Sequence, residues 1–437
     1  MLYRLCLYCE DTYYTLIAEP WDAHAMVAGK PAPAAAHSLP DQPLLMVPVE
    51  HHGSLQAFYT ELRSHFTRLF LGIKVGVSEP GRFVLHWPEN GEGRVDVFRE
   101  LARFSSPDRH GRVAGSYVEL IGKTPLYRLN SLARALGATV LVKLESMEPG
   151  SVKDRAVAGM VRAAIDRGEL DAETRVVEAS SGNVAFAMAA ILQAEFGKKP
   201  VVFISRMHGP VKAKAVRCAG CPIVVTPGES GTLGAKKASK DYAAATGAWE
   251  LNQHSNPDNP ETHRKTTGPE LYHQCFELEG KPPSEFVTGI GSGGTAIGVA
   301  MFREDIGADF KIIGVEPAEA SLLSGGAFNA HGFSGIAPGF ITGIVERERH
   351  RLDGIETVSR EEGYHTCRRM LAEEGLLVGP TSGASIAVAL RRASLPENRG
   401  KVIVTIAHDR GDRYLDVDGL FEPPDEATER EIHDVFV

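Results

Sequence analysis

The stretch Glu285-Phe-Val-Thr-Gly-Ile-Gly-Ser-Gly-Gly-Thr295 joins a short apolar run to a turn that contains four glycines. This pattern predicts a buried strand, a tight turn and the start of a helix. Unpaired backbone N–H groups at a helix N-terminus attract phosphate, and glycines let the anion approach them closely. The stretch therefore predicts an α/β fold with an anion-binding turn at the end of one strand.

The same glycines leave a second interpretation open. Gly289, Gly291 and Gly294 fit the G-x-G-x-x-G fingerprint of nicotinamide dinucleotide enzymes, and Glu316 ends the next predicted strand about twenty residues later. A nicotinamide-dependent dehydrogenase is therefore an alternative function. The Lys-Ser/Thr pair of nucleoside triphosphatases is absent from this turn, which disfavours that class of enzyme.

A second strand–turn–helix pattern, Glu178-Ala-Ser-Ser-Gly-Asn183, offers hydroxyl groups, an amide and another helix N-terminus. Lys153 stands upstream, between the Pro149-Gly150 turn and a predicted helix start. A lysine, a phosphate cradle and a carboxylate cradle are what an amino acid bound to pyridoxal phosphate (PLP) requires. Together these features favour PLP over a nicotinamide cofactor.

From Tyr117 to Leu415 the chain resembles the cysteine synthase/cystathionine β-synthase family of PLP enzymes. Each shared motif is weak alone, but all of them occur in the family's order. They are Ile121-Gly-Lys-Thr-Pro-Leu126, Ser151-Val-Lys-Asp-Arg155, Ser180-Ser-Gly-Asn183, Gln253, Asn256-Pro-Asp-Asn-Pro260, Thr267-Gly-Pro-Glu270, Gly291-Ser-Gly-Gly-Thr295, Val315-Glu-Pro317, Gly335-Ile-Ala-Pro-Gly-Phe340, Glu374-Gly-Leu-Leu-Val-Gly-Pro-Thr-Ser-Gly383 and Asp409-Arg-Gly-Asp-Arg-Tyr-Leu415. The resemblance implies a two-lobed fold-type II PLP enzyme, similar to tryptophan synthase β, with parallel sheets.

The resemblance also implies a role for each matching residue. Lys153 matches the catalytic lysine that forms the internal Schiff base with PLP. Asn183 matches the residue that bonds the 3′-oxygen of the pyridine ring, and Thr381 matches the hydroxyl that faces the ring nitrogen. The loop for the cofactor phosphate is Gly291, Ser292, Gly293, Gly294 and Thr295. The groups for the substrate α-carboxylate are Ser180, Ser181, Gly182, Asn183 and Gln253.

These matches imply β-replacement on an activated L-serine, O-acetylserine or O-phosphoserine, through an aminoacrylate, as in a cysteine synthase. A neutral hydroxyl at Thr381 does not hold the ring nitrogen protonated, and this favours β-elimination over transamination. Val184 replaces the family's usual threonine, so the nucleophile stays open: sulfide, homocysteine as in cystathionine β-synthase, or an amine giving a diaminopropionate-type amino acid. Arg206 or Arg217 could meet a phosphorylated donor. A catalytically reduced regulatory protein is a further alternative.

Residues 1–112 have a different composition from the rest of the chain. Leu2–Cys9 and Thr12–Ala18 predict a hairpin, Leu55–Leu69 an amphipathic helix and Phe83–Trp87 a strand. We expect a small N-terminal α+β module there, whose role stays open between packing, extension of a dimer, a lid and the docking of a carrier or partner protein. We also expect a large PLP-binding domain from residues 113–155 and 262–437. Residues 156–261 are expected to form a small substrate-loop domain.

Composition limits the partners. The net charge of −9 disfavours nucleic acid, and no apolar run is long enough to span a membrane. The two CxxC pairs, Cys6/Cys9 and Cys218/Cys221, could in principle bind zinc. We expect instead that these cysteines are small buried side chains and bind no metal. Because the first residues lack the apolar core of a signal peptide, we expect a cytoplasmic enzyme. The family resemblance suggests a homodimer that acts on small amino acids.

Overall fold

The computed structural model describes residues 114–180, 182–208, 214 and 216–421, together with five strands in the first 113 residues. The chain divides into two units. The first is Met1–Val113 with Tyr272–Pro282 and Glu304–Ala308. The second is Ala114–Leu271 with Pro283–Arg303 and Asp309–Val437.

The first unit contains an antiparallel sheet of five strands in the order β3-β2-β1-β5-β4. The predicted hairpin is present: β1 (Leu2–Cys9) pairs with β2 (Tyr13–Trp21), so that Leu2 lies opposite Trp21 and Cys9 opposite Tyr14. The predicted strand near Phe83 is β5 (Arg82–His86). The other two strands are β3 (Leu45–Pro48) and β4 (Lys74–Glu79). The helix predicted over residues 55–69 lies outside the described residues.

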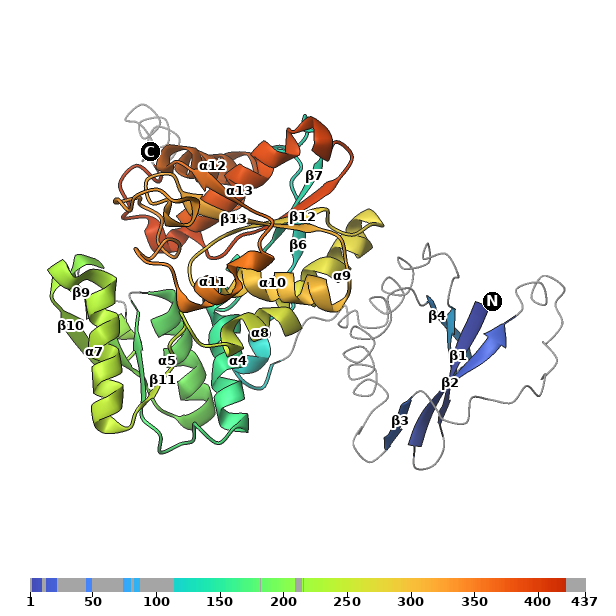
Figure 1. Ribbon diagram of the computed structural model, residues 1–437, viewed down its shortest axis with the longest axis horizontal. Coiled ribbons are helices and arrows are strands. Elements are labelled where there is room, and N and C mark those ends of the chain that lie inside the picture. The colour runs from blue at the N-terminus through green and yellow to red at the C-terminus, as the bar shows by residue number, and fades with distance from the viewer. Residues whose placement is uncertain are drawn as a thin grey trace, which may run out of the picture. The chain divides into compact units, whose positions relative to one another are not determined.

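The second unit contains two sheets (Figure 1). The larger has six strands in the order β14-β13-β12-β15-β7-β6, and only β6 runs antiparallel to its neighbour. Its strands are β6 (Leu126–Arg128), β7 (Thr139–Lys143), β12 (Glu285–Gly289), β13 (Lys311–Pro317), β14 (Gly354–Val358) and β15 (Val402–Ile406). All five residues of β15 are buried, as expected for a central parallel strand with both faces covered.

The smaller sheet is fully parallel, in the order β10-β9-β8-β11. Its strands are β8 (Val176–Ala179), β9 (Val201–Ser205), β10 (Ile223–Thr226) and β11 (Trp249–Glu250). The prediction of an α/β chain with parallel sheets is therefore confirmed. We call this sheet and its helices the small lobe, and the six-stranded sheet and its helices the large lobe.

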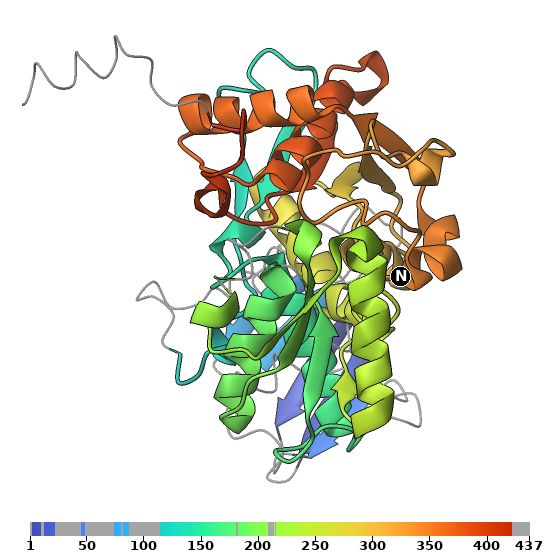
Figure 2. The ribbon, with the colours of Figure 1, turned by 90° about the vertical axis from the view of Figure 1, so that its left-hand side faces the viewer.

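Helices connect the strands and cover the sheets, as Figures 1 and 2 show. In the small lobe these are α4 (Val152–Asp166), α5 (Asn183–Phe196), α7 (Gly231–Thr246) and α8 (Asp258–Lys265). The remainder are α9 (Thr267–Glu279), α10 (Gly294–Asp305), α11 (Gly343–Glu348), α12 (Arg360–Glu374) and α13 (Pro380–Ala393). Helix α13 is buried from Pro380 to Ala389 because it packs on the six-stranded sheet and on α12.

Each lobe has its own apolar core. In the large lobe, side chains of β7, β12, β13 and β15 pack against α12 and α13. In the small lobe, α4 packs on α5 through residues that include Val157, Met160 and Met188. Both cores leave the carboxyl ends of the parallel strands to the turns that follow, which is where α/β proteins bind their ligands. No helix in the described part of the chain is long and apolar enough to span a membrane.

Candidate active site

Lys153 lies in the first turn of α4. The Ser151 side chain caps this helix by accepting a hydrogen bond from the backbone N–H of Lys153 (3.2 Å), and Asp154 accepts one from the Ser151 N–H (2.5 Å). This reciprocal cap fixes where the helix begins. The N–H of Val152 donates to the carbonyl of His408 just beyond β15 (2.8 Å). Lys153 is therefore held next to the carboxyl end of the central strand.

A buried ion-pair cluster anchors the same turn of α4. Arg155 is 2% exposed and contacts Glu145 (2.8 Å) and Glu270 (2.9 Å), and Lys143 also contacts Glu270 (2.8 Å). Removing one member of a buried ion pair leaves the other charge without compensation. Arg155 belongs to the sequence motif Ser151–Arg155, but the sequence did not predict that Glu145 and Glu270 are its partners. The cluster ties α4 to β7 and α9.

The amine of Lys153 interacts electrostatically with three histidines and one carboxylate. Burial lowers the pKa of Lys153, and the charge of Asp409 partly opposes this effect. Burial together with the charge of Lys153 lowers the pKa of His408 to about 3. Burial, Lys236 and Lys153 lower the pKa of His254 to about 3, and the pKa of His263 is also well below its usual value. These imidazoles are therefore neutral at physiological pH.

The glycine-rich turn after β12 lies where the sequence placed it, at the N-terminus of α10. A side chain on Gly291 would overlap the carbonyl oxygen of Gly335, and one on Gly293 would come within 2.5 Å of Val345. Gly293 also has a φ of +88°, which favours glycine. The Ser292 hydroxyl accepts a hydrogen bond from Gly294 N (3.3 Å). The turn is thus a rigid cradle that exposes backbone N–H groups of the first turn of α10.

Two neighbours hold this cradle in place. Asn259 donates to the Ser292 hydroxyl (3.1 Å) and to the Gln253 carbonyl (2.8 Å). Thr342 donates to the Ser292 carbonyl (2.8 Å), and the hydroxyl of Thr295 lies 3.3 Å from His263 Nε2. The loop of Gln253 and the phosphate-type cradle are therefore part of one hydrogen-bonded arrangement.

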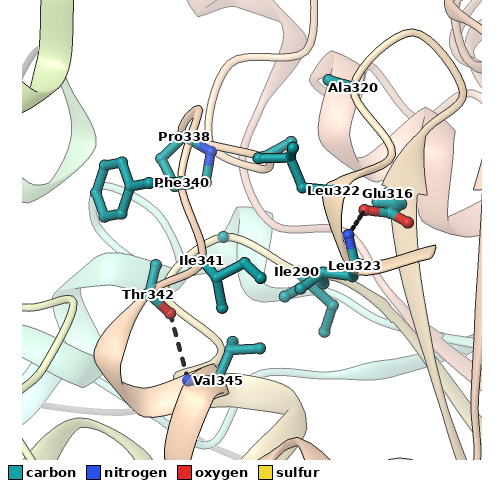
Figure 3. A pocket seen from close by; sticks show the side chains of 12 residues that line it. Ile290, Glu316, Ala320, Leu322, Leu323, Pro338, Phe340, Ile341, Thr342 and Val345 are labelled. Atoms are coloured by element: carbon teal, nitrogen blue, oxygen red, sulfur yellow. Dashed lines mark hydrogen bonds between the residues drawn. The ribbon is translucent and has the colours of Figure 1, made fainter. Parts of the chain in front are cut away.

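Glu316 does not fit the role that a nicotinamide site would require. Its carboxylate is 1% exposed and accepts hydrogen bonds from the backbone N–H groups of Leu323 (2.9 Å) and Ser324 (2.8 Å). Figure 3 shows this carboxylate beside a small pocket, lined mostly by apolar side chains such as Ile290, Leu322 and Ile341. The acidic residue that should bond a ribose is thus used to order a loop of the protein.

The second cradle, at the N-terminus of α5, is formed differently. The hydroxyl of Ser180 accepts hydrogen bonds from the N–H groups of Gly182 (3.3 Å) and Ala185 (3.2 Å). A side chain added to Gly182 would meet no atom of the described residues within 4 Å, so among these residues the turn is open on this side. Ser181 lies outside the described residues. Val184 is 5% exposed and belongs to the core between α4 and α5.

Asn183 is clamped between two residues of the large lobe. Its side-chain N–H group donates to Asp409 (2.7 Å), and its oxygen accepts from Arg413 (2.7 Å). Tyr414 donates to the same oxygen of Asp409 (2.5 Å). The two bonds fix the orientation of the Asn183 amide at the start of α5. Asp409 and Arg413 belong to the sequence motif 409–415, but the sequence did not predict that they hold the Asn183 amide.

The remaining predicted residues also lie near these turns. Thr381 is in the first turn of α13, is 4% exposed, and donates to the Ser334 carbonyl (2.9 Å) next to the loop that closes on Gly291. Gln253 is 8% exposed and follows Asn252, whose N–H donates to Glu178 (2.6 Å). Burial and the nearby charge of Glu250 raise the pKa of Glu178 to about 8.

Other residues singled out in the sequence lie apart from this arrangement. Arg206 and Arg217 are exposed, and no contact of their side chains with the site residues is present among the described residues. Cys221 is buried and packs beside α5, as expected, whereas Cys218 is exposed. The expectation of burial is therefore wrong for Cys218, because the turn at Gly220 leaves the end of its helix in solvent.

The arrangement fits PLP. The cradle at Gly291–Thr295 is closed to side chains and suits a phosphate, and Lys153 supplies an amine for the aldehyde. Buried polar atoms also remain without hydrogen-bond partners among the described residues next to Lys153, namely Asp409 Oδ1 and His408 Nδ1. Asn183 and Thr381 offer polar groups for a pyridine ring. The described residues at this site are therefore chemically compatible with PLP.

Comparison with known proteins agrees with this geometry. Residues 118–409 match the family model described as pyridoxal-phosphate dependent enzyme. A probable cysteine synthase of Bacillus subtilis is 37% identical over 309 residues, which are 70% of this chain and 98% of that protein.

Solved structures give the same result. An O-ureido-L-serine synthase is 33% identical with a TM-score of 0.66, over 73% of this chain and 100% of the other. A cysteine synthase from Entamoeba histolytica is 31% identical with a TM-score of 0.66, over 75% of this chain and 97% of the other. The chain therefore belongs to the cysteine synthase/cystathionine β-synthase family of fold-type II, PLP-dependent enzymes.

Proposed function

We propose that this enzyme catalyses β-replacement on O-acetyl-L-serine or O-phospho-L-serine, as a cysteine synthase does. One observation carries the proposal: Lys153 is fixed in the first turn of α4, and it interacts electrostatically with a neighbour of each glycine-containing turn. These neighbours are Asp409, which bonds Asn183 at the start of α5, and His263, which lies against Thr295 at the start of α10. The closed cradle suits a permanently bound phosphate. The open cradle suits a carboxylate that arrives and leaves with each substrate.

The proposal assigns the cofactor contacts to this chain's residues. Lys153 would hold PLP through its aldehyde, and the Asn183 side chain would bond the 3′-oxygen. The loop Gly291, Ser292, Gly293, Gly294 and Thr295 receives the phosphate, and Thr381 faces the ring nitrogen. When bound, PLP supplies an electron sink for the negative charge that develops on the substrate α-carbon.

Substrate binding and proton transfer follow from the same residues. Ser180, Ser181, Gly182, Asn183 and Gln253 receive the α-carboxylate at the positive N-terminus of α5. Because burial lowers the pKa of Lys153, its amine would be suited to take the α-proton of a bound substrate. Thr381 presents a neutral hydroxyl, and a neutral partner for the ring favours loss of the β-substituent over transamination.

One turnover assay identifies both the donor and the nucleophile. The purified enzyme is incubated with O-acetyl-L-serine or O-phospho-L-serine, and the release of acetate or phosphate is followed with sulfide, L-homocysteine or an amine as acceptor. We expect release of one leaving group and a new amino acid with one acceptor. Lys153→Ala should remove the turnover. Bound PLP without turnover on either donor would instead favour a regulatory protein.

We also propose an oligomeric state and a cellular compartment for this enzyme. We infer a cytoplasmic homodimer, with the N-terminal sheet β1–β5 either packing within the assembly or docking a partner protein. The domain boundaries proposed from the sequence, at residues 113, 156 and 262, are part of it. Light scattering of the full chain tests the dimer, and a mass of one chain would contradict it.

A further inference from the structure

Lys236 is a half-buried lysine in the second turn of α7. Its ammonium lies 5.5 Å from the centre of the Phe340 ring, which belongs to the large-lobe loop that follows Gly335. Within the described residues, no salt bridge or hydrogen bond engages this ammonium. Lysines seldom lose water without gaining a partner, so a cation placed in this way calls for an explanation.

The surroundings place Lys236 at the active site. The ring of His254 lies edge-on to the same Phe340, with ring centres 5.3 Å apart. His254 follows Gln253, which we assign to the substrate carboxylate. The charges of Lys236 and Lys153 both act on His254, so the imidazole lies within electrostatic reach of both amines.

Among the described residues, no carboxylate forms a salt bridge with Lys236. Glu178 is the carboxyl on which its charge acts, and burial together with Glu250 raises the pKa of Glu178 to about 8. That carboxyl is therefore mostly protonated at neutral pH. Glu250 on β11 accepts a hydrogen bond from Ser239 (3.2 Å), one turn further along α7. The next lysine, Lys237, is exposed and pairs with Asp241 (2.6 Å).

We propose that Lys236 is a substrate-binding residue that receives an oxyanion of a substrate beside Phe340 and His254. The inference rests on the proposed β-replacement. The oxyanion is the phosphate of O-phospho-L-serine or the carboxylate of an amino-acid nucleophile, since an ammonium forms charge-assisted hydrogen bonds with either group. In this way Lys236 selects among donors or acceptors, while Lys153 carries out the chemistry.

The first test measures anion binding without turnover. Inorganic phosphate is titrated calorimetrically into the PLP-loaded wild type, Lys236→Met, Lys236→Arg and the matched control Lys237→Met. We expect Lys236→Met to weaken phosphate binding about tenfold or more, because one charge-assisted hydrogen bond is lost. Lys236→Arg should keep most of the affinity, and Lys237→Met all of it.

The second test distinguishes the two sources of the oxyanion. If Lys236 binds the donor phosphate, Lys236→Met raises the KM for O-phospho-L-serine and leaves that for O-acetyl-L-serine unchanged. If it binds the nucleophile, the variant raises the KM for L-homocysteine with either donor and leaves that for sulfide unchanged.

Equal phosphate affinity and equal kinetics in Lys236→Met and Lys237→Met would overturn the proposal. If the wild type turns over no donor, the proposed function fails, but the phosphate titration still decides the role of Lys236.

Discussion

The two helix N-termini of the active site look alike in sequence and differ in structure. The turn before α10 is packed so tightly that a side chain on Gly291 would overlap the Gly335 carbonyl. In the turn before α5, a side chain added to Gly182 would meet no described atom within 4 Å. A closed turn suits a ligand that stays, and an open one suits ligands that exchange. The difference supports our proposal that the cofactor phosphate binds to the turn of the large lobe and the substrate carboxylate to the turn of the small lobe.

The largest effect is expected from Gly291→Ala. The added methyl group must displace the Gly335 carbonyl, and such overpacking costs roughly 1–3 kcal/mol. We expect PLP to bind about tenfold or more weakly, as measured by equilibrium dialysis with detection of the cofactor absorbance.

Gly182→Ala is the matched variant in the other turn. Its methyl group enters the space assigned to the substrate, so PLP affinity should stay near that of the wild type while the KM for the donor rises. If Gly182→Ala releases the cofactor and Gly291→Ala retains it, the assignment of the two turns is reversed.

A second prediction concerns acid stability in the large lobe. The pKa of His408 is about 3 in the folded chain, and His408 is 7% exposed. The unfolded chain therefore binds more protons between about pH 6.5 and pH 3, and the free energy of unfolding falls as the pH is lowered through this window. Between pH 6.5 and pH 5, His408 should lower the free energy of unfolding by about 2 kcal/mol. Urea unfolding at both pH values should show a smaller fall in His408→Asn.

The small lobe should respond in the opposite direction. Burial raises the pKa of Glu178 to about 8, so the folded chain binds more protons than the unfolded chain between about pH 4.5 and pH 8. This contribution to the free energy of unfolding falls as the pH rises through that window. Glu178→Gln should therefore lose less stability than the wild type between pH 6 and pH 8, by about 1–2 kcal/mol in urea unfolding. Parallel curves for the two proteins would contradict a protonated Glu178.

The smallest effect is expected at the Asn183 clamp. Arg413→Met removes one hydrogen bond to the Asn183 oxygen, worth about 0.5–1.5 kcal/mol, and lets the amide turn. We expect PLP to bind a few-fold more weakly and its visible absorption band to shift, because Asn183 is assigned to the 3′-oxygen. Arg410→Met is the control, since Arg410 is exposed and pairs with Asp412 (3.2 Å). Identical spectra for Arg413→Met and Arg410→Met would remove Arg413 from the cofactor site.

Local patterns explain which parts of this site were predictable. Both glycine-containing turns and the capped start of α4 are short-range features, and the structure places them as the sequence indicated. The partners of Asn183 come from Asp409 and Arg413, more than two hundred residues away, so no local pattern reveals them. Val184 is a second example. The sequence shows a valine where the family usually has a threonine hydroxyl, but only the structure shows that this side chain packs in the core.

The central claim is that the amine of Lys153 carries the cofactor between the two turns. Reduction of the purified holoenzyme with borohydride, followed by peptide mass spectrometry, tests it directly. We expect the pyridoxyl group on Lys153 alone and no such group in Lys153→Ala. Attachment to another lysine, Lys236 included, or no attachment in the wild type would show that Lys153 does not carry the cofactor.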